Sequence, residues 1–470
     1  MNLSSLIAGK AVAGSGSILV RSPHTGTEVG QVACASRKDV EAAIALARAF
    51  RDTPNRYERS RILDLTRAAL ETKREEFACL ITGESGLAMR EARYEVGRTL
   101  EVLRCASMEA LRDDGQIYST DIAPQGKARK IFTTREPLRC AAAITPFNHP
   151  LNQVAHKVAP AIAAGTPLVL KPSEKTPLTA FKFAELLYAA GLPGPMLSVV
   201  VGPTSEVAEV LVRHPAVDLV AFTGSVAVGK KIASIAGYKK LVLELGGNDP
   251  LIVLNDADLD LAVTLAAEGS YRNSGQRCTA VKRILVEDGI AENFTSRLVE
   301  KTKEYQCGDP TDENTRVGTV IDEASAVSLE TVLREAVAQG AKVLIGGARR
   351  GAFLEPTVVS DVPRDCRMVV CESFGPLAPI IKVRNLDDAL EVANSTDYGL
   401  SSGIVTTNLQ SAIKAIKTLR CGTVNVNEIP GFRVENSPFG GIKDSGLGVK
   451  EGVVEAIKAY SFVKTFSLPW

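Results

Sequence analysis

Residues 166–191 read TPLVLKPSEKTPLTAFKFAELLYAAG and form one complete strand–turn–helix unit. The apolar run 168–170 is short and ends in a polar turn, which is typical of a buried parallel strand. The segment 178–190 carries apolar residues at helical spacing and closes on Gly191, a common residue at helix ends. Such a unit is the building block of doubly wound α/β folds, in which ligands bind beyond the carboxyl ends of the strands.

The same unit recurs along the chain. CAAAITPFNHP at 140–150 and VDLVAFTGS at 217–225 are further strand–turn segments, each followed by a helical stretch. A second alternating stretch runs from residue 248 to about residue 427, with strand candidates such as KRILVED and LAPIIKV. The pattern predicts an α/β protein with a Rossmann-like unit and a second α/β unit. A chain of 470 residues exceeds the size of one hydrophobic core, so two or more domains are expected.

The two ends of the chain have other patterns. Helical periodicity dominates the first hundred residues, as in the stretches 37–50 and 56–85. Residues 118–136 are typical of a β-hairpin that belongs to neither α/β unit, and residues 456–470 also have strand character. We therefore expect a small β element besides the two larger units.

The composition excludes several classes of function. The chain is 45% hydrophobic and 23% charged with a net charge of +1, which favours neither a nucleic acid nor an anionic membrane as partner. No apolar run approaches the length of a membrane span, and the N-terminus lacks the features of a signal peptide. Nine cysteines scattered singly favour a reduced, cytoplasmic protein. The four histidines are not grouped with cysteines at ligand spacing, so no metal is expected.

Cys278, in SGQRCTAVKR at 274–283, has a setting that differs from that of the other cysteines. A lone cysteine is usually a small buried hydrophobe. Here small and polar neighbours indicate a turn or a helix start, where backbone N–H groups and the charge of Arg277 would stabilise a thiolate. The sequence therefore makes Cys278 a candidate nucleophile.

Two further residues would complete an acyl-transfer site. Glu244 stands at the end of an apolar run and precedes two glycines, and apolar surroundings raise the pKa of a carboxyl group toward that of a general base. The alternative, a carboxylate paired with a structural lysine, is about equally probable from this fragment alone. Asn148, in TPFNHP, lies at the mouth of a predicted strand and would donate to a developing oxyanion. On its own it is a common turn residue.

Three segments are candidates for nucleotide binding. FTGSVAVG at 222–229 is a glycine-containing turn into a helix, whose N–H groups would hold a pyrophosphate, although its spacing matches neither standard phosphate-binding motif. LKPSEKTP places Lys171 and Glu174 beyond a strand, and CESFGP places Glu372 in a loop. Each carboxylate would suit ribose hydroxyls.

Together these motifs resemble the NAD(P)-dependent aldehyde dehydrogenase superfamily. TPFNHP, LKPSEKTP, FTGSVAVG, LELGG, GQRC, CESFGP and SPFGGIKDSG occur in the family's order between residues 145 and 446. The resemblance implies the aldehyde dehydrogenase fold, with a Rossmann-like NAD-binding domain of residues 1–117 and 136–247 and a catalytic domain of residues 248–430. It also implies a small β oligomerisation element of residues 118–135 and 451–470, and hence a homodimer or homotetramer.

The resemblance also implies roles for single residues. Cys278 would be the nucleophile, Glu244 the general base, and Asn148 the oxyanion donor. The implied cofactor-binding residues are Thr145, Lys171, Pro172, Ser173, Glu174, Gly224, Ser225, Gly229, Glu372 and Phe374. NAD is expected rather than NADP, because a carboxylate at Glu174 would accept the ribose 2′-hydroxyl and repel a 2′-phosphate.

The expected reaction is the oxidation of an aldehyde to its carboxylic acid through a thioester on Cys278. Relatives that transfer the acyl group to CoA need no hydrolytic base, so Glu244 favours hydrolysis. A structural protein that has kept the fold without activity is the non-enzymatic alternative. The presence of Cys278, Glu244 and Asn148 together argues against it.

Positively charged residues indicate the substrate class. The family positions that line the substrate tunnel are occupied here by Arg98, His149, Arg277, Thr279 and Arg433. One arginine alone is usually a surface charge, but three with a histidine call for an anionic aldehyde, and their number suggests a dianion. The pattern is most similar to the phosphonoacetaldehyde dehydrogenase branch of the family, which makes phosphonoacetate. Non-phosphorylating oxidation of glyceraldehyde 3-phosphate, and oxidation of succinate semialdehyde or lactaldehyde, are the alternatives.

Overall fold

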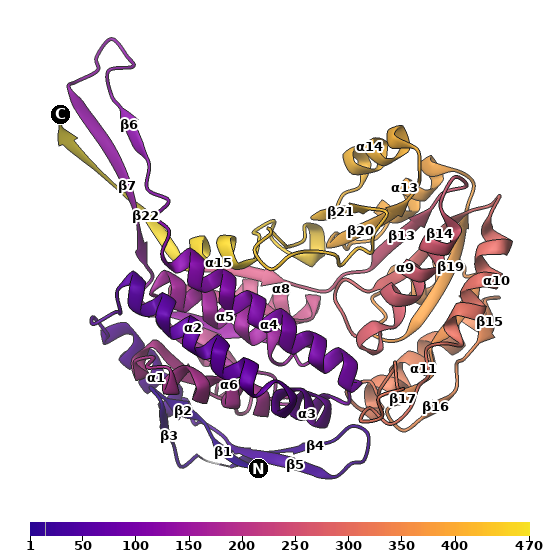
Figure 1. Ribbon diagram of the computed structural model, residues 1–470, viewed down its shortest axis with the longest axis horizontal. Helices are drawn as coiled ribbons and strands as arrows, with labels where there is room; N and C mark the ends of the chain where they lie inside the picture. Colours follow the sequence, from indigo (N-terminus) through magenta and orange to yellow (C-terminus); the bar gives the residue numbers. More distant parts are fainter. Residues whose placement is uncertain (15) are drawn as a thin grey trace.

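The computed structural model describes residues 1–14 and 16–470, which form two large β-sheets with helices on both faces and a small sheet that projects from one end (Figure 1). The N-terminal half of the chain builds most of the first large sheet, and residues 249–426 build the second. The chain then returns to the first half through α15 (Val453–Ala459), which packs on α5 (Asn152–Ala164).

The first large sheet has seven strands in the order β12–β11–β8–β9–β10–β2–β3. Their bounds are β12 (Lys240–Glu244), β11 (Leu219–Thr223), β8 (Ala141–Ile144), β9 (Leu168–Lys171), β10 (Leu197–Val199), β2 (Leu6–Ile7) and β3 (Lys10–Ala11). The first five are parallel, as their short, mostly apolar sequences predict. Their carboxyl ends therefore lie at one edge, where Thr223 of β11 is paired with Glu244 of β12.

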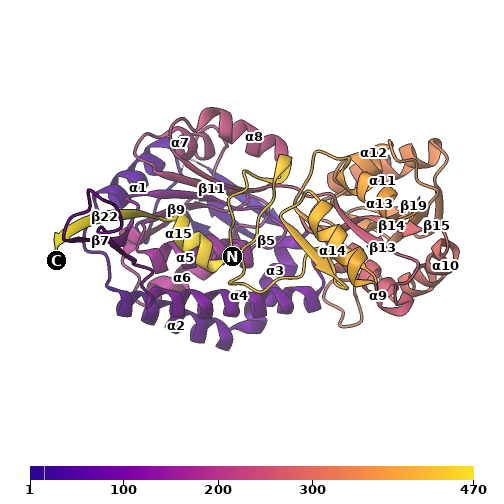
Figure 2. The same cartoon turned by 90° about the horizontal axis from the view of Figure 1, so that it is seen from above.

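Helices cover both faces of this sheet (Figure 2). One face is covered by α2 (Arg56–Thr72), α3 (Arg74–Ser85), α4 (Met89–Ala110), α5 and α6 (Leu178–Ala189). The other face is covered by α1 (Arg37–Ala49), α7 (Ala208–Arg213) and α8 (Val226–Ile235). Each face has its own apolar cluster. The doubly wound arrangement predicted from the strand–turn–helix repeats is confirmed.

The second large sheet also has seven strands, in the order β15–β18–β19–β14–β13–β20–β21. Their bounds are β15 (Lys342–Ile345), β18 (Thr357–Ser360), β19 (Leu377–Val383), β14 (Val281–Glu287), β13 (Asp249–Val253), β20 (Ser401–Val405) and β21 (Thr423–Val426). All but β15 run parallel. The helices on its faces are α9 (Leu259–Tyr271), α10 (Ala291–Thr302), α11 (Glu323–Ala338), α13 (Leu386–Asn394) and α14 (Leu409–Thr418).

The small projecting sheet has the order β22–β7–β6. Strand β22 (Ser461–Pro469) pairs along its whole length with β7 (Arg129–Pro137), and β7 pairs with β6 (Ile117–Ser119) on its other side. Both the predicted hairpin and the predicted C-terminal strand are therefore present, in one element. Figure 1 shows it extending away from the rest of the molecule.

The N-terminus differs from the helical prediction. The helices of the first hundred residues begin only at Arg37, and the segment before them forms strands. A three-stranded sheet there consists of β1 (Asn2–Ser4), β5 (Glu28–Ala33) and β4 (Ser17–Arg21). These strands are short and one-sided, so they carry little periodic signal, and long-range pairing decides their structure.

Candidate active site

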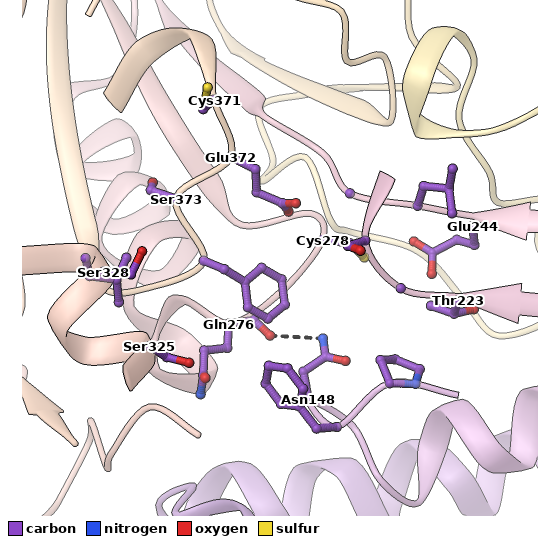
Figure 3. A pocket seen from close by; sticks show the side chains of 18 of the residues that line it. Asn148, Thr223, Glu244, Gln276, Cys278, Ser325, Ser328, Cys371, Glu372 and Ser373 are labelled. Carbon is purple, nitrogen blue, oxygen red and sulfur yellow. Dashed lines mark hydrogen bonds between the residues drawn. The ribbon is translucent and has the colours of Figure 1, made fainter. Parts of the chain in front are cut away.

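Cys278 follows a tight turn between α9 and β14 (Figure 3). Asn273, Ser274 and Gly275 have consecutive positive φ values of 58°, 53° and 69°. Residues other than glycine rarely adopt this conformation, and it persists where the surroundings enforce it. A side chain at Gly275 would collide with the carbonyl oxygen of Gly375. The turn is therefore packed tightly enough to fix the direction in which Cys278 points.

Asn148 lies in the loop between β8 and α5 and is tied to this turn. Its Nδ2 donates to the carbonyl oxygen of Gln276 at 2.9 Å (Figure 3). In turn, Nδ2 of Asn273 donates to the carbonyl oxygen of Asn148 at 3.1 Å. One hydrogen of the Asn148 amide stays available, and no hydrogen bond within the described residues uses the N–H of Cys278. These two donors are placed to meet an oxygen that becomes negative.

Glu244 ends β12 and faces the same space. It is 1% exposed, and neither carboxyl oxygen has a hydrogen-bond partner within the hydrogen-bonding network of residues 1–14 and 16–470. Burial, and next the negative charge of Glu451, raise the pKa of Glu244 to about 7. Burial and the neighbouring Glu244 also raise the pKa of the Cys278 thiol well above its usual value. Near neutral pH the Cys278 thiol therefore keeps its proton, whereas about half of the Glu244 carboxyl group is ionised and can accept one.

Cys278, Glu244 and Asn148 line one cavity of about 450 Å³, which we call the catalytic cavity. Four of the predicted cofactor residues line it as well, namely Gly224, Ser225, Glu372 and Phe374. The other predicted cofactor residues do not line it, namely Thr145, Lys171, Pro172, Ser173, Glu174 and Gly229. The structure thus brings together three catalytic candidates that are spread over 131 residues of sequence, from 148 to 278.

Glu372 is held by a buried lysine. Lys282 Nζ donates to Glu372 Oε1 at 2.8 Å and to the carbonyl oxygens of Gly247 and Cys278 at 2.7 and 2.8 Å. The N–H of Gly247 donates to the same carboxylate oxygen at 3.2 Å. Because Lys282 is 1% exposed, it fixes Glu372 and the Cys278 loop relative to each other.

The polar edge of the first sheet fits a dinucleotide. Ser225 caps the N-terminus of α8, and Gly229 is needed there because a side chain would collide with Leu245. The buried hydroxyls of Thr145, Thr223 and Ser373 have no hydrogen-bond partner within the described part of the chain. Open N–H groups at a helix start and unsatisfied hydroxyls suit the phosphates and ribose of a nucleotide.

Lys171 and Glu174 lie at the carboxyl end of β9 and pair with each other. Lys171 Nζ is 2.7 Å from Glu174 Oε1, with Lys171 buried and the Glu174 side chain 41% exposed. The lysine orients the carboxylate without removing its negative charge from the surface. This is the arrangement needed to accept two ribose hydroxyls.

A second cavity of about 750 Å³, which we call the arginine cavity, is lined by α4 and by the loop of residues 433–436. Its arginines are Arg74, Arg93, Arg98, Arg104 and Arg433. The charge of Arg433 opposes the upward pKa shifts of both Cys278 and Glu244, so this arginine lies within electrostatic reach of the catalytic cavity. Its guanidinium stacks over the Phe439 ring at 3.7 Å.

The predicted tunnel residues differ in how their charge is matched. Arg98 donates to both oxygens of Glu435 at 2.6 and 3.1 Å, and His149 Nδ1 lies 3.4 Å from Glu95 Oε2. Arg277 lines neither cavity, since its Nη2 donates to the carbonyl oxygens at the end of α9 at 2.7 and 3.1 Å.

Thr279 is buried against Gly431 and also lines neither cavity. No salt bridge within the described residues involves Arg277 or Arg433. Of the four positively charged groups expected in the tunnel, Arg98 and His149 are therefore paired with buried carboxylates. Arg277 and Arg433 are left without such a partner among the described residues.

The aldehyde dehydrogenase family model matches residues 11–466. The chain belongs to this family. Similar proteins include the 3-sulfolactaldehyde dehydrogenase of Priestia aryabhattai, 40% identical over 440 residues that cover 93% of this chain and 92% of the relative. The resemblance inferred from the motifs is confirmed for the family, and the protein is an oxidoreductase that acts on aldehydes.

Solved structures agree with the fold of this aldehyde dehydrogenase. Aldehyde dehydrogenase 21 from Physcomitrella patens, solved with its reaction product succinate, has a TM-score of 0.95 at 35% identity and covers 99% of this chain and 98% of its own. An NADP-dependent glyceraldehyde-3-phosphate dehydrogenase from Bacillus halodurans, solved with NADP, has a TM-score of 0.96 at 34% identity and covers 100% and 99%. The predicted fold is confirmed, and NAD or NADP is the cofactor typical of such enzymes.

Three residues of the site were not predicted from the sequence, namely Lys282, Glu95 and Glu435. Lys282 gave a usable signal, because it and Arg283 are charged residues in a strand whose other residues up to Val286 are apolar. Glu95 and Glu435 gave none, because Glu95 contacts the N–H groups of residues 151 and 152 and Glu435 contacts Arg98, which is 337 residues away. Such contacts become visible only in the folded molecule.

The described residues give no sign of a metal centre or of a membrane anchor. No group of three or more histidine, cysteine or acidic side chains in residues 1–14 and 16–470 is arranged to hold a metal ion. Within the same residues, no helix has the length and apolar character needed to cross a bilayer.

Proposed function

We propose that this aldehyde dehydrogenase uses NAD to oxidise a short anionic aldehyde to its carboxylic acid. The observation that carries the proposal is the convergence of Cys278, Glu244 and Asn148 on one cavity, with Arg433 within electrostatic reach of it. The first three supply the chemistry, and the arginine supplies a reason for the substrate to be negatively charged.

The reaction would begin at the thiol. Glu244 accepts the proton of Cys278, and the sulfur adds to the aldehyde carbon. The carbonyl oxygen becomes negative and is held by the free Asn148 amide hydrogen and by the N–H of Cys278. When bound, NAD supplies the hydride acceptor that turns this adduct into a thioester.

Hydrolysis would use the same carboxylate again. Glu244 first gives up the proton of Cys278 to solvent and then takes a proton from water, and the resulting hydroxide attacks the thioester carbon. The bond between carbon and sulfur breaks, Glu244 returns its proton to the Cys278 sulfur, and the carboxylic acid leaves. A base with a pKa of about 7 suits this step near neutral pH, because about half of it is ionised there and it is still basic enough to accept a proton.

NAD is our proposal over NADP. Glu174 keeps a partly exposed carboxylate, oriented by Lys171, at the end of β9. A carboxylate at this place would accept the 2′-hydroxyl of the adenosine ribose and repel a 2′-phosphate.

The charge of the arginine cavity bears on the identity of the anion. Glu435 matches Arg98, so Arg433 is left as the unmatched charge beside this pair in the arginine cavity. This favours a single negative charge, as on a sulfonate or carboxylate, over the dianion suggested by the sequence. Phosphonoacetaldehyde remains one candidate substrate beside 3-sulfolactaldehyde, succinate semialdehyde, lactaldehyde and glyceraldehyde 3-phosphate.

The test is NADH formation with these five aldehydes and with uncharged propanal, each repeated with NADP. We expect kcat/KM to be higher for at least one anionic aldehyde than for propanal, and higher with NAD than with NADP. If propanal, or lactaldehyde, which is also uncharged, has the highest kcat/KM, the anionic-substrate proposal is wrong. If NADP is preferred, the assignment of Glu174 is wrong.

We also propose that the small β sheet joins copies of the chain into a homodimer or homotetramer. Large apolar side chains of β22 are exposed, namely Phe462, Val463, Phe466 and Leu468. Family members are typically oligomeric. The domain limits at residues 117, 136, 247 and 430 and the cytoplasmic location inferred from the sequence remain predictions.

A further inference from the structure

A buried charge cluster stands beside Arg433 in the arginine cavity. Glu435 accepts from Nε and Nη2 of Arg98 at 2.6 and 3.1 Å, and Nε2 of His156 lies 2.7 Å from Oε2, the oxygen that also accepts from Nη2. Glu435 is 8% exposed and His156 is 4% exposed. The catalytic roles described above use neither residue.

The cluster has a defined net charge. Burial lowers the pKa of His156, so the imidazole is neutral near pH 7. The hydrogen bond from His156, followed by the charge and hydrogen bonds of Arg98, holds the pKa of Glu435 below its usual range despite its burial, so Glu435 is ionised. Arg98 and Arg433 contribute two positive charges and Glu435 one negative charge, which leaves one positive charge at this part of the cavity.

The other carboxylates of the cavity act differently. Glu75 pairs with Arg93 and Glu101 pairs with Arg104, and the side chains of both acids are more than half exposed. Water and salt screen such pairs strongly, so they change the potential inside the cavity little. Glu435 is the carboxylate of this cavity that is shielded from solvent.

We propose that Glu435 is a specificity-determining residue that sets the cavity to bind monoanionic aldehydes and to disfavour dianionic ones. The carboxylate keeps Arg98 as a hydrogen-bond donor beside Arg433 while cancelling its charge. A substrate with one negative charge then meets one net positive charge, whereas a second negative charge would approach Glu435 without a cation of its own. This inference rests on the proposed anionic substrate.

The test replaces Glu435 with glutamine, which keeps an acceptor for Arg98 and removes the charge. The readout is the ratio of kcat/KM for phosphonoacetaldehyde, a dianion at pH 8, to kcat/KM for succinate semialdehyde, a monoanion. We expect the ratio to rise in Glu435→Gln by about tenfold, the scale of one desolvated charge contact. An unchanged ratio overturns the inference.

The matched control is Glu313→Gln. Glu313 places no charge in the interior, since it pairs at 2.7 Å with Arg93 at the cavity rim and its side chain is 66% exposed. We expect the control to keep the wild-type ratio. A rise equal to that of Glu435→Gln would mean that any lost carboxylate has this effect, which overturns the special role of Glu435.

A double variant separates charge from shape. Arg98→Gln with Glu435→Gln restores one net positive charge, so its ratio should return toward the wild-type value. This variant also serves if Glu435→Gln alone does not fold, because it removes Arg98 together with its partner and so creates no new unpaired buried charge. A double variant that keeps the raised ratio would contradict the inference. The wild-type enzyme preferring propanal to both anions would instead contradict the proposed function on which the inference rests.

Discussion

The catalytic cavity and the arginine cavity are built by different means. The catalytic cavity is made from strand ends and turns, and its key residues are placed by the backbone: Glu244 ends β12, and Cys278 follows a turn of three left-handed residues. The arginine cavity is made from the side of a helix and a long loop, and its character comes from side-chain ion pairs such as Arg98 with Glu435.

This difference separates chemistry from specificity. Backbone placement at the edge of a parallel sheet is a property of the fold, so the chemistry it supports is fixed once the fold forms. Side-chain pairs can be changed one residue at a time without altering the fold, so they are the natural place for substrate choice. Substitutions in the two cavities should therefore have effects of different kind and size.

The largest effect should follow from replacing Cys278 with serine. We expect the loss of NADH formation by a factor of roughly a thousand or more, because no other group can form the thioester. The matched control is Cys371→Ser, a second thiol that lines the same cavity. Steady-state kinetics with the best aldehyde of the panel would measure both. Comparable losses in the two variants would contradict the assignment of Cys278.

The next largest effect should come from Glu244→Gln. We expect the steady-state rate to fall by roughly a hundredfold or more, because water would have to attack the thioester without the help of a general base. The wild-type rate should rise as pH passes upward through about 7, since the Glu244 carboxyl is protonated below its raised pKa and cannot act as a base. Rapid mixing with measurement of initial rates from pH 6 to 8 would test both expectations. A pH profile in Glu244→Gln that matches the wild type would exclude Glu244 as the titrating base.

The same contrast explains how far the sequence could predict the molecule. Apolar runs that end in turns locate parallel strands, so the pattern could place Asn148 and Glu244 at the carboxyl ends of two such strands. Cys278 instead precedes β14 of the second sheet, and the resemblance to the family was needed to join it to the other two. The ion pair that balances the charge of Arg98 could not be predicted in this way, because its partner Glu435 lies far along the chain. Arg277 stands next to Cys278 in sequence, yet its side chain turns to the carbonyl groups that end α9. Adjacent residues can face opposite ways, and only packing decides which way each points.

A smaller effect, on selectivity, should follow from Arg433→Ala. We expect kcat/KM for anionic aldehydes to fall relative to propanal by roughly ten- to a hundredfold, because an unmatched charge near the reacting carbon is lost. Arg277→Ala should change this selectivity less and lower the melting temperature instead, since it removes two hydrogen bonds to the end of α9. A matched control is Arg350→Ala, which also removes an arginine stacked on a phenyl ring, here that of Phe353 at 5.4 Å. Equal losses of selectivity in Arg433→Ala and Arg277→Ala would show that Arg277 does contribute to substrate binding.

The smallest effect should come from Glu174→Ser, a substitution at the carboxyl end of β9, where we expect the adenosine ribose of the cofactor to bind. The carboxylate lies partly in solvent, which screens its repulsion of a 2′-phosphate. We therefore expect the ratio of kcat/KM with NADP to that with NAD to rise by only about tenfold. Aldehyde selectivity should stay unchanged, since the arginine cavity is built by other elements. Glu185→Ser, which removes an exposed carboxylate paired with Lys182 on α6, is the matched control. If both variants keep the wild-type cofactor ratio, Glu174 does not contact the ribose, and cofactor choice has to be encoded elsewhere along the sheet edge.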